Sequence, residues 1–174
     1  MSKHSIFIDN IAFAKNNEQL EGDLSLADCP RLAELLQTND NQDSIANTSS
    51  HIRYTLQGSA DVVGQHYLHL TLNATLRTTC QRCLGAMQLE LALNFNYLIG
   101  DVAVDDVETI EIEGSDDFDL QQASSEMDVN KLIEDEIIMA MPIAPIHEKS
   151  CGAIITESGE KINPFAALKG LIKA

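Results

Sequence analysis

Two cysteines, Cys80 and Cys83, have the residue type and spacing best suited to chemistry, since only two residues separate them and Gly85 follows. A turn of this kind lets two thiolates converge on one point, and glycine permits the tight backbone that donates N–H groups to sulfur. Such a pair is half of a metal site. His147 and Cys151, with three residues between them, are the natural candidates for the other half. The four side chains would form a Cys3His set that suits zinc in a structural site, because protein ligands fill all four positions.

Other interpretations of these residues stay open. His147 could be an ordinary loop histidine and Cys151 a buried thiol, in which case no metal binds. A metal- or thiol-dependent enzyme built on Cys80 and Cys83 is the alternative function. However, a redox pair of the thioredoxin type lies at a helix N-terminus within a βαβ pattern, and this pair does not. The chain also has no glycine-rich phosphate loop, Gly-x-Ser-x-Gly elbow or His-Glu-x-x-His motif, so we expect a protein that is not an enzyme.

A long β-hairpin is predicted to carry the first cysteine pair at its tip. Apolar and polar residues alternate along about 66–78 and again along about 87–97, which is the period of a strand with one buried face. The two strands would be the centre of an antiparallel sheet. The apolar positions are Leu68, Leu70, Leu72, Ala74 and Leu76 before the turn, and Met87, Leu89, Leu91, Leu93, Phe95 and Tyr97 after it.

Helices are predicted to flank this sheet at about 29–37, 128–141 and 164–172, which indicates an α+β fold. Asp128 would cap the second helix, and a connector with two prolines would lead from its end to His147. A further strand or docking arm is expected at Ser5 to Phe13. We expect a single domain over 1–174, interrupted by a polar loop at about 37–50 and an acidic loop at about 101–120.

Charge limits the possible partners. The chain of 174 residues has 27 acidic and 11 basic residues and a net charge of −16, with nine acids between Asp101 and Asp119. Such a field repels phosphate backbones, so tight binding to nucleic acid without a partner is disfavoured. The acidic loop is either solvated or a docking surface for a basic partner. No segment has the length or pattern of a signal peptide or membrane span, so we expect a cytoplasmic protein with no membrane contact.

Two further groups of residues are candidates for binding a partner. Glu134, Asp135 and Glu136 are consecutive on a predicted helix, so they point in different directions and cannot converge on one substrate. We expect them to be helix-surface charge or part of an acidic docking face. The C-terminal helix begins with a cap, a proline and an apolar residue, and its apolar side chains could fill a groove of the protein itself or of a partner. Its candidate residues are Asn163, Pro164, Phe165 and Leu168.

Three motifs follow one another along the chain: Cys80-Gln-Arg-Cys83-Leu, then Ile133-Glu-Asp-Glu-Ile-Ile-Met-Ala-Met-Pro142-Ile-Ala-Pro-Ile-His147 with Cys151 behind it, then Asn163-Pro-Phe165-Ala-Ala-Leu168. In this order they resemble the YceD family, which is named for large ribosomal RNA subunit accumulation. The resemblance implies a non-catalytic bacterial factor that supports synthesis, processing or stability of 23S rRNA, and hence assembly of the large ribosomal subunit. It brings no catalytic residues.

Charge and resemblance together suggest how such a factor would act. Our hypothesis is that the protein holds a basic ribosomal protein or assembly factor of the large subunit and reaches rRNA only through it. Complementary charge would speed that encounter more than it would tighten the complex. No small-molecule substrate is expected.

Overall fold

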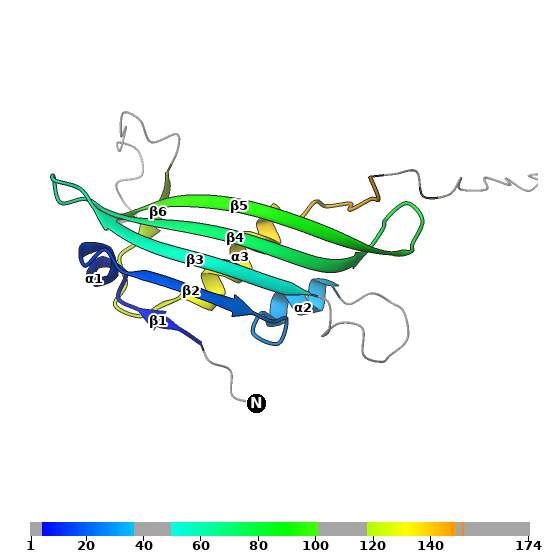
Figure 1. Ribbon diagram of the computed structural model, residues 1–174, viewed down its shortest axis with the longest axis horizontal. Helices are drawn as coiled ribbons and strands as arrows, with labels where there is room; N and C mark the ends of the chain where they lie inside the picture. The colour runs from blue at the N-terminus through cyan, green and yellow to red at the C-terminus, as the bar shows by residue number, and fades with distance from the viewer. Residues whose placement is uncertain (1–4, 37–49, 101–117, 149–150, 152–174) are drawn as a thin grey trace, which may run out of the picture.

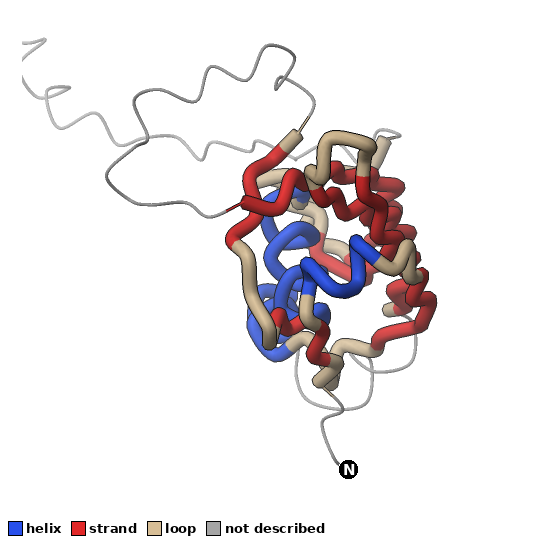
Figure 2. The backbone as a smooth tube through the Cα atoms, turned by 90° about the vertical axis from the view of Figure 1, so that its left-hand side faces the viewer, coloured by secondary structure: helices blue, strands red, loops and turns tan. Residues whose placement is uncertain are grey.

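The computed structural model describes residues 5–36, 50–100, 118–148 and 151. They form an α+β fold with helices packed against one face of a five-stranded sheet, which confirms the predicted class. Figure 1 shows the long strands lying across the helices, and Figure 2, turned by 90°, shows the helices against one side of the main sheet. None of the helices in the described part of the chain is both long and apolar enough to cross a bilayer.

Three predicted features lie wholly or mostly outside the described residues. These are the polar loop at about 37–50, the acidic loop at about 101–120 and the helix at about 164–172. Whether residues 1–174 form a single domain therefore stays a prediction. Within the described residues, one cluster of buried apolar side chains connects the helices to the main sheet.

The main sheet is antiparallel except at one edge. Its strand order is β2-β3-β4-β5-β6, where only the β5–β6 pair is parallel, and a separate two-stranded sheet pairs β1 with β7. The long β4–β5 hairpin positions the cysteine turn and agrees closely with the predicted strands. The strands are β1 Phe7–Ile8, β2 Gln19–Leu24, β3 His51–Ala60, β4 His66–Thr79, β5 Ala86–Gly100, β6 Asp119–Gln122 and β7 Met127–Asp128.

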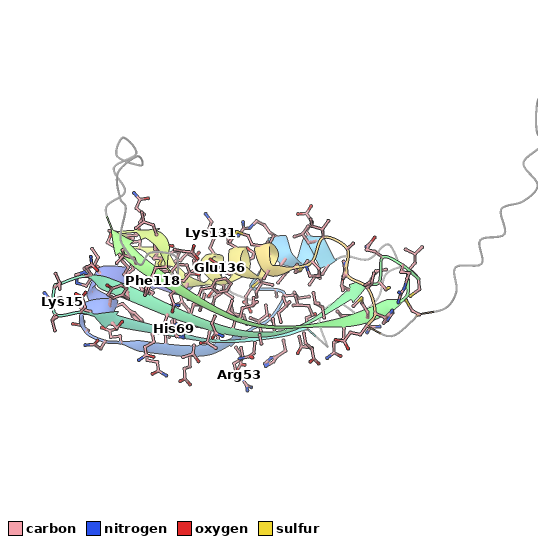
Figure 3. All side chains as sticks on the ribbon, turned by 90° about the horizontal axis from the view of Figure 1, so that it is seen from above. Lys15, Arg53, His69, Phe118, Lys131 and Glu136 are labelled. Carbon is pink, nitrogen blue, oxygen red and sulfur yellow. The ribbon has the colours of Figure 1, made fainter. Side chains whose placement is uncertain are left out.

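The alternation of apolar and polar residues along the hairpin explains why one of its faces packs against the helices. Residues directly opposite each other on β4 and β5 point to the same face, as Leu72 and Leu93 do, so both apolar rows meet the helices. On β4 these side chains are at most 3% exposed, whereas the β5 row from Leu89 to Phe95 is only partly buried. The opposite face carries polar side chains, among them Arg53 and His69, which Figure 3 shows on the side away from the helices.

The N-terminal segment differs from its prediction. A strand or docking arm was expected from Ser5 to Phe13, but the structure has only the short strand β1 there, followed by helix α1, Asn10–Lys15. The carboxylate of Asp9 accepts the N–H group of Ala12 at 2.9 Å and so caps this helix. An Asp before an apolar run was the signal for a helix start, and it outweighs the apolar character of the segment.

The other two described helices agree with their predictions. They are α2, Pro30–Leu36, and α3, Val129–Ala140, whose N-cap Asp128 accepts the N–H group of Lys131 at 3.2 Å. Along α3, side chains four residues apart form a fully buried stripe against the core, namely Val129, Ile133 and Ile137. Packing of this stripe against the core orients α3, and the chain after α3 leads to the cysteine turn.

Candidate metal centre

The cysteine turn closes the far end of the β4–β5 hairpin. The N–H group of Cys80 donates to the carbonyl of Gly85 at 2.9 Å, and the N–H group of Leu84 donates to the carbonyl of Cys80 at 2.8 Å. Leu84 has a φ of 58°, the left-handed conformation that side chains other than glycine rarely adopt. The tight backbone expected at Gly85 is therefore found one residue earlier, while Gly85 leaves space beside the sulfur of Cys83.

The segment after α3 brings the second pair of ligands to this turn. The chain leaves α3 at Met141 and passes through Pro142 and Pro145, which cannot continue a helix. The N–H group of Gln81 donates to the carbonyl of Pro145 at 2.8 Å, so the connector is hydrogen-bonded to the hairpin tip. Figure 1 shows this segment running from the end of α3 towards the tip. Cys83 of the turn and His147 of the connector, which are 64 positions apart in the sequence, thereby come into contact.

The structure brings together the four residues that the sequence singled out. Within the described residues, the sulfur atoms of Cys80, Cys83 and Cys151 and a ring nitrogen of His147 all lie within 4.8 Å of one another. The sulfurs of Cys80 and Cys151 are 3.6 Å apart, and the sulfur of Cys83 is 3.5 Å from Nδ1 of His147. Around a tetrahedral zinc ion, sulfur–sulfur and sulfur–nitrogen separations would be about 3.8 and about 3.6 Å. The arrangement is compatible with a metal site.

Backbone N–H groups prepare Cys80 as an anionic ligand. Burial by itself raises the pKa of the Cys80 thiol, but the N–H groups of Cys83, His147 and Arg82 outweigh it and lower the pKa to about 5. For Cys83, the N–H group of Gly85 lowers the pKa, but burial and the neighbouring sulfurs leave it raised. Because a thiolate and not a thiol binds metal, Cys80 is already in its ligating form at neutral pH.

The pKa values of the second pair, His147 and Cys151, are also shifted by their neighbours. The hydrogen bond from Arg82 is the main reason that the pKa of the Cys151 thiol is lowered. The sulfurs of Cys151 and Cys80 in turn raise the pKa of His147, because negative charge favours the imidazolium form. A metal ion would displace this proton, since the ligating histidine must be neutral.

Arg82 was not predicted as a site residue. Its Nε donates to the sulfur of Cys151 at 3.1 Å and its Nη2 donates to the carbonyl of His147 at 3.3 Å. The sequence feature that could have pointed to Arg82 is its position inside the Cys-x-x-Cys motif, where a cation lies next to two potential thiolates. Its contacts could not be foreseen, because both partners come from the connector after α3.

The expectation that Glu134, Asp135 and Glu136 form helix-surface charge is wrong for two of the three. Glu134 and Glu136 are only 4% and 7% exposed, whereas the side chain of Asp135 is 41% exposed. The carboxylate of Glu134 accepts the N–H groups of Arg31 and Leu32 at 2.6 and 3.0 Å, at the start of α2. It therefore caps a neighbouring helix, because the amide groups of a first turn have no partner within their own helix.

Glu136 has a second internal role. The hydroxyl of Tyr97, on β5, donates to its carboxylate at 2.7 Å, and Figure 3 shows Glu136 on the side of α3 that faces the sheet. Consecutive residues on a helix are about 100° apart. Three carboxylates in a row therefore reach three different surroundings, of which only that of Asp135 is open to solvent. The other residues proposed for partner binding, Asn163, Pro164, Phe165 and Leu168, lie outside the described residues.

Comparison with known proteins adds one finding. The family model described as "Large ribosomal RNA subunit accumulation protein YceD" matches residues 68–172, which include the β4–β5 hairpin except for its first two residues, α3 and all four residues of the cluster. No solved structure matches the chain.

Proposed function

The chain belongs to the YceD family, and on that premise we propose that it supports synthesis, processing or stability of 23S rRNA by binding a basic ribosomal protein or assembly factor. The family is named for accumulation of the large ribosomal RNA subunit, and the name describes an accumulation factor rather than an enzyme. The action we propose is non-catalytic, takes place in the cytoplasm and serves assembly of the large subunit.

The family match is the observation that carries this proposal. It spans the hairpin, the helix and the connector that together build the cysteine cluster, so it covers a structural unit and not an isolated motif. The cluster itself favours binding over catalysis, since a catalytic zinc site keeps one position for water or substrate and here four protein groups converge.

Charge supports the choice of a basic partner. A net charge of −16 creates a negative field around the protein, and a positively charged ribosomal protein would be drawn into it. Rates of association between complementary charged surfaces rise at low ionic strength and fall as salt screens them. The same field opposes direct contact with rRNA.

We propose that Cys80, Cys83, His147 and Cys151 hold a structural zinc ion. Three thiolates and one imidazole are ligands that zinc prefers, and the separations of the donor atoms fit its tetrahedral coordination. When bound, the ion would cross-link the hairpin tip to the connector after α3. Both segments would then present one fixed surface at the end of the molecule.

Depletion of the protein in cells tests the proposed function. We expect a selective fall in the ratio of 23S to 16S rRNA, with unprocessed precursor ends, and recovery when the chain is supplied again. An unchanged ratio would contradict the proposal. As a control, supplying the Cys29→Ala variant should restore the ratio as the wild-type chain does, because Cys29 is a buried thiol that is not part of the cluster.

A binding assay tests the proposed route to rRNA. The purified protein should bind a basic large-subunit protein with an association rate that falls as salt is added, and it should bind a 23S fragment only when that partner is present. Tight binding to the fragment alone at physiological salt would contradict the indirect route. The alternative function, an enzyme that uses Cys80 and Cys83, predicts instead that a variant lacking these thiols keeps its partner and loses turnover of a substrate.

A further inference from the structure

We infer that Arg82 is a positioning residue for the metal centre: it holds Cys151 and the backbone of His147 against the cysteine turn and neutralises the charge of the thiolates. This inference rests on the proposed zinc site. It concerns a residue that binds no metal itself and acts through two residues that would.

The first observation is the reach of the side chain. Arg82 lies between the two cysteines of the turn, yet its guanidinium group contacts residues 69 and 65 positions later, Cys151 through Nε and the carbonyl of His147 through Nη2. A guanidinium presents several N–H donors in one plane, so it can hold a sulfur and a carbonyl oxygen at the same time. Together with the bond from Gln81 to Pro145 and the contacts among the four candidate ligands, these bonds connect the turn to the residues after α3.

The second observation is the charge balance. Three thiolates and a neutral imidazole around Zn²⁺ carry a net charge of −1. The guanidinium of Arg82 lies 3.1 Å from one of these sulfurs and stays positive at all physiological pH values. It therefore offsets the negative charge of the zinc-bound set. An N–H donor to a metal-bound sulfur also orients that ligand, as outer hydrogen bonds do in metal sites generally.

The role of Arg82 is thus distinct from that of the core. Its hydrogen bonds to Cys151 and His147 lie at the hairpin tip, and Arg82 is not a member of the buried apolar core that includes the stripe of α3. Its loss should weaken metal binding with little effect on the stability of the sheet. Loss of an outer-shell partner in metal sites typically lowers affinity by about 10- to 100-fold.

Zinc affinity in a set of matched variants tests this inference. The affinity of the reduced protein for Zn²⁺ would be measured by competition with a chromophoric chelator, in wild type, Arg82→Gln, Arg82→Lys and Arg53→Gln. We expect Arg82→Gln to bind about 10- to 100-fold more weakly and Arg82→Lys to recover part of the loss, since lysine keeps the charge without the planar donors. Arg53→Gln is the control: Arg53 is an exposed arginine that pairs with Asp23, and its loss should change the affinity less than about twofold.

Absorption of bound Co²⁺ separates positioning from ligation. At saturation, Arg82→Gln should keep the wild-type thiolate-to-cobalt bands, because all four ligands are still present, and its thermal melting without metal should match wild type. Equal zinc affinity in wild type and Arg82→Gln would overturn the role of Arg82 while leaving the metal centre intact. Failure of wild type itself to bind zinc would instead refute the proposed centre, so the two failures are distinguishable.

Discussion

The tip of the β4–β5 hairpin and the body of the same hairpin are stabilised in different ways. In the body, Leu70, Leu72 and Leu76 are fully buried against the helices, and the sheet is stabilised by apolar contact. At the tip, Cys80 is buried but Cys83 and Leu84 are exposed, and the contacts of the turn include hydrogen bonds to sulfur and between backbone groups. One continuous ladder of paired residues connects the two regions. From this difference we expect the body to fold by apolar burial alone and the tip to need a further constraint, which we propose is zinc.

The largest effect is expected from removing two ligands at the tip. Four ligands share a binding free energy of about 10 to 16 kcal/mol in structural zinc sites, so Cys80→Ser with Cys83→Ser should cost on the order of 5 kcal/mol, or several thousandfold in affinity. Competition with a chelator measures this loss. In zinc-free buffer the urea midpoint should stay close to that of wild type, because none of the four candidate ligands belongs to the apolar core of the body.

The double cysteine variant requires a control in which a thiol is removed but the four candidate ligands are kept. Cys29→Ala removes a thiol that lies in the core at the start of α2, and zinc affinity should be unchanged. If the double cysteine variant unfolded in zinc-free buffer, the separation of tip and body would be wrong.

A core substitution in the body should have the opposite pattern: it should lower the free energy of unfolding and leave zinc affinity unchanged. Ile133→Ala removes a fully buried side chain of α3 and should lower the free energy of unfolding by about 3 kcal/mol, from lost burial and the cavity that remains. Urea denaturation measures this cost, with the 70% exposed Met139→Ala as a control expected to change it by less than about 0.5 kcal/mol. Zinc affinity of the folded variant should be retained. A parallel fall in zinc affinity would show that the two regions are coupled.

A smaller cost is expected at the contact between α2 and α3. Glu134→Gln removes the charge that accepts the N–H groups of Arg31 and Leu32 and pairs with the Arg31 guanidinium at 3.0 Å, so unfolding should become easier by about 2 kcal/mol. Asp135→Asn breaks an exposed ion pair with the same arginine and should cost less than about 1 kcal/mol. Guanidinium denaturation of both variants makes the comparison. Equal costs would mean that burial of Glu134 contributes nothing.

The smallest effect is expected at Glu136, and its sign depends on pH. Burial raises the pKa of this carboxyl group, and the hydrogen bond from Tyr97, which lowers it, does not compensate. Because the pKa is higher in the folded than in the unfolded state, the contribution of Glu136 is fully present below the unfolded value of about 4.3 and is lost as the pH rises through the folded value.

Glu136→Gln removes this titration and keeps an oxygen for the Tyr97 hydroxyl. The variant should match wild type near pH 4 and be slightly more stable near pH 8, by less than about 1 kcal/mol. Urea midpoints across this range measure the difference, and Glu90→Gln, on an exposed residue of β5, is the control. A variant that loses stability at the higher pH would contradict the direction of the shift.

Local sequence patterns predicted much of the fold. Alternation along β4 and β5 predicted the hairpin, because a strand in a sheet with one buried face must repeat with period two. Asp128 and the spacing from Val129 to Ile137 predicted α3 in the same way. The segment before Phe13 was predicted wrongly, since a short apolar run does not separate a strand from a helix and the cap at Asp9 decided the outcome.

The sequence by itself determined which side chains could serve as ligands, because thiolate and imidazole chemistry belongs to the residue type and the Cys-x-x-C spacing is local. Only the tertiary structure decided that Cys80 and Cys83 meet His147 and Cys151, that Arg82 reaches across to them, and that Glu134 and Glu136 are buried. Each of these contacts joins residues 39 to 103 positions apart, at distances set by how α3 packs on the sheet. Local periodicity contains no information about such packing, since it follows from the whole apolar core.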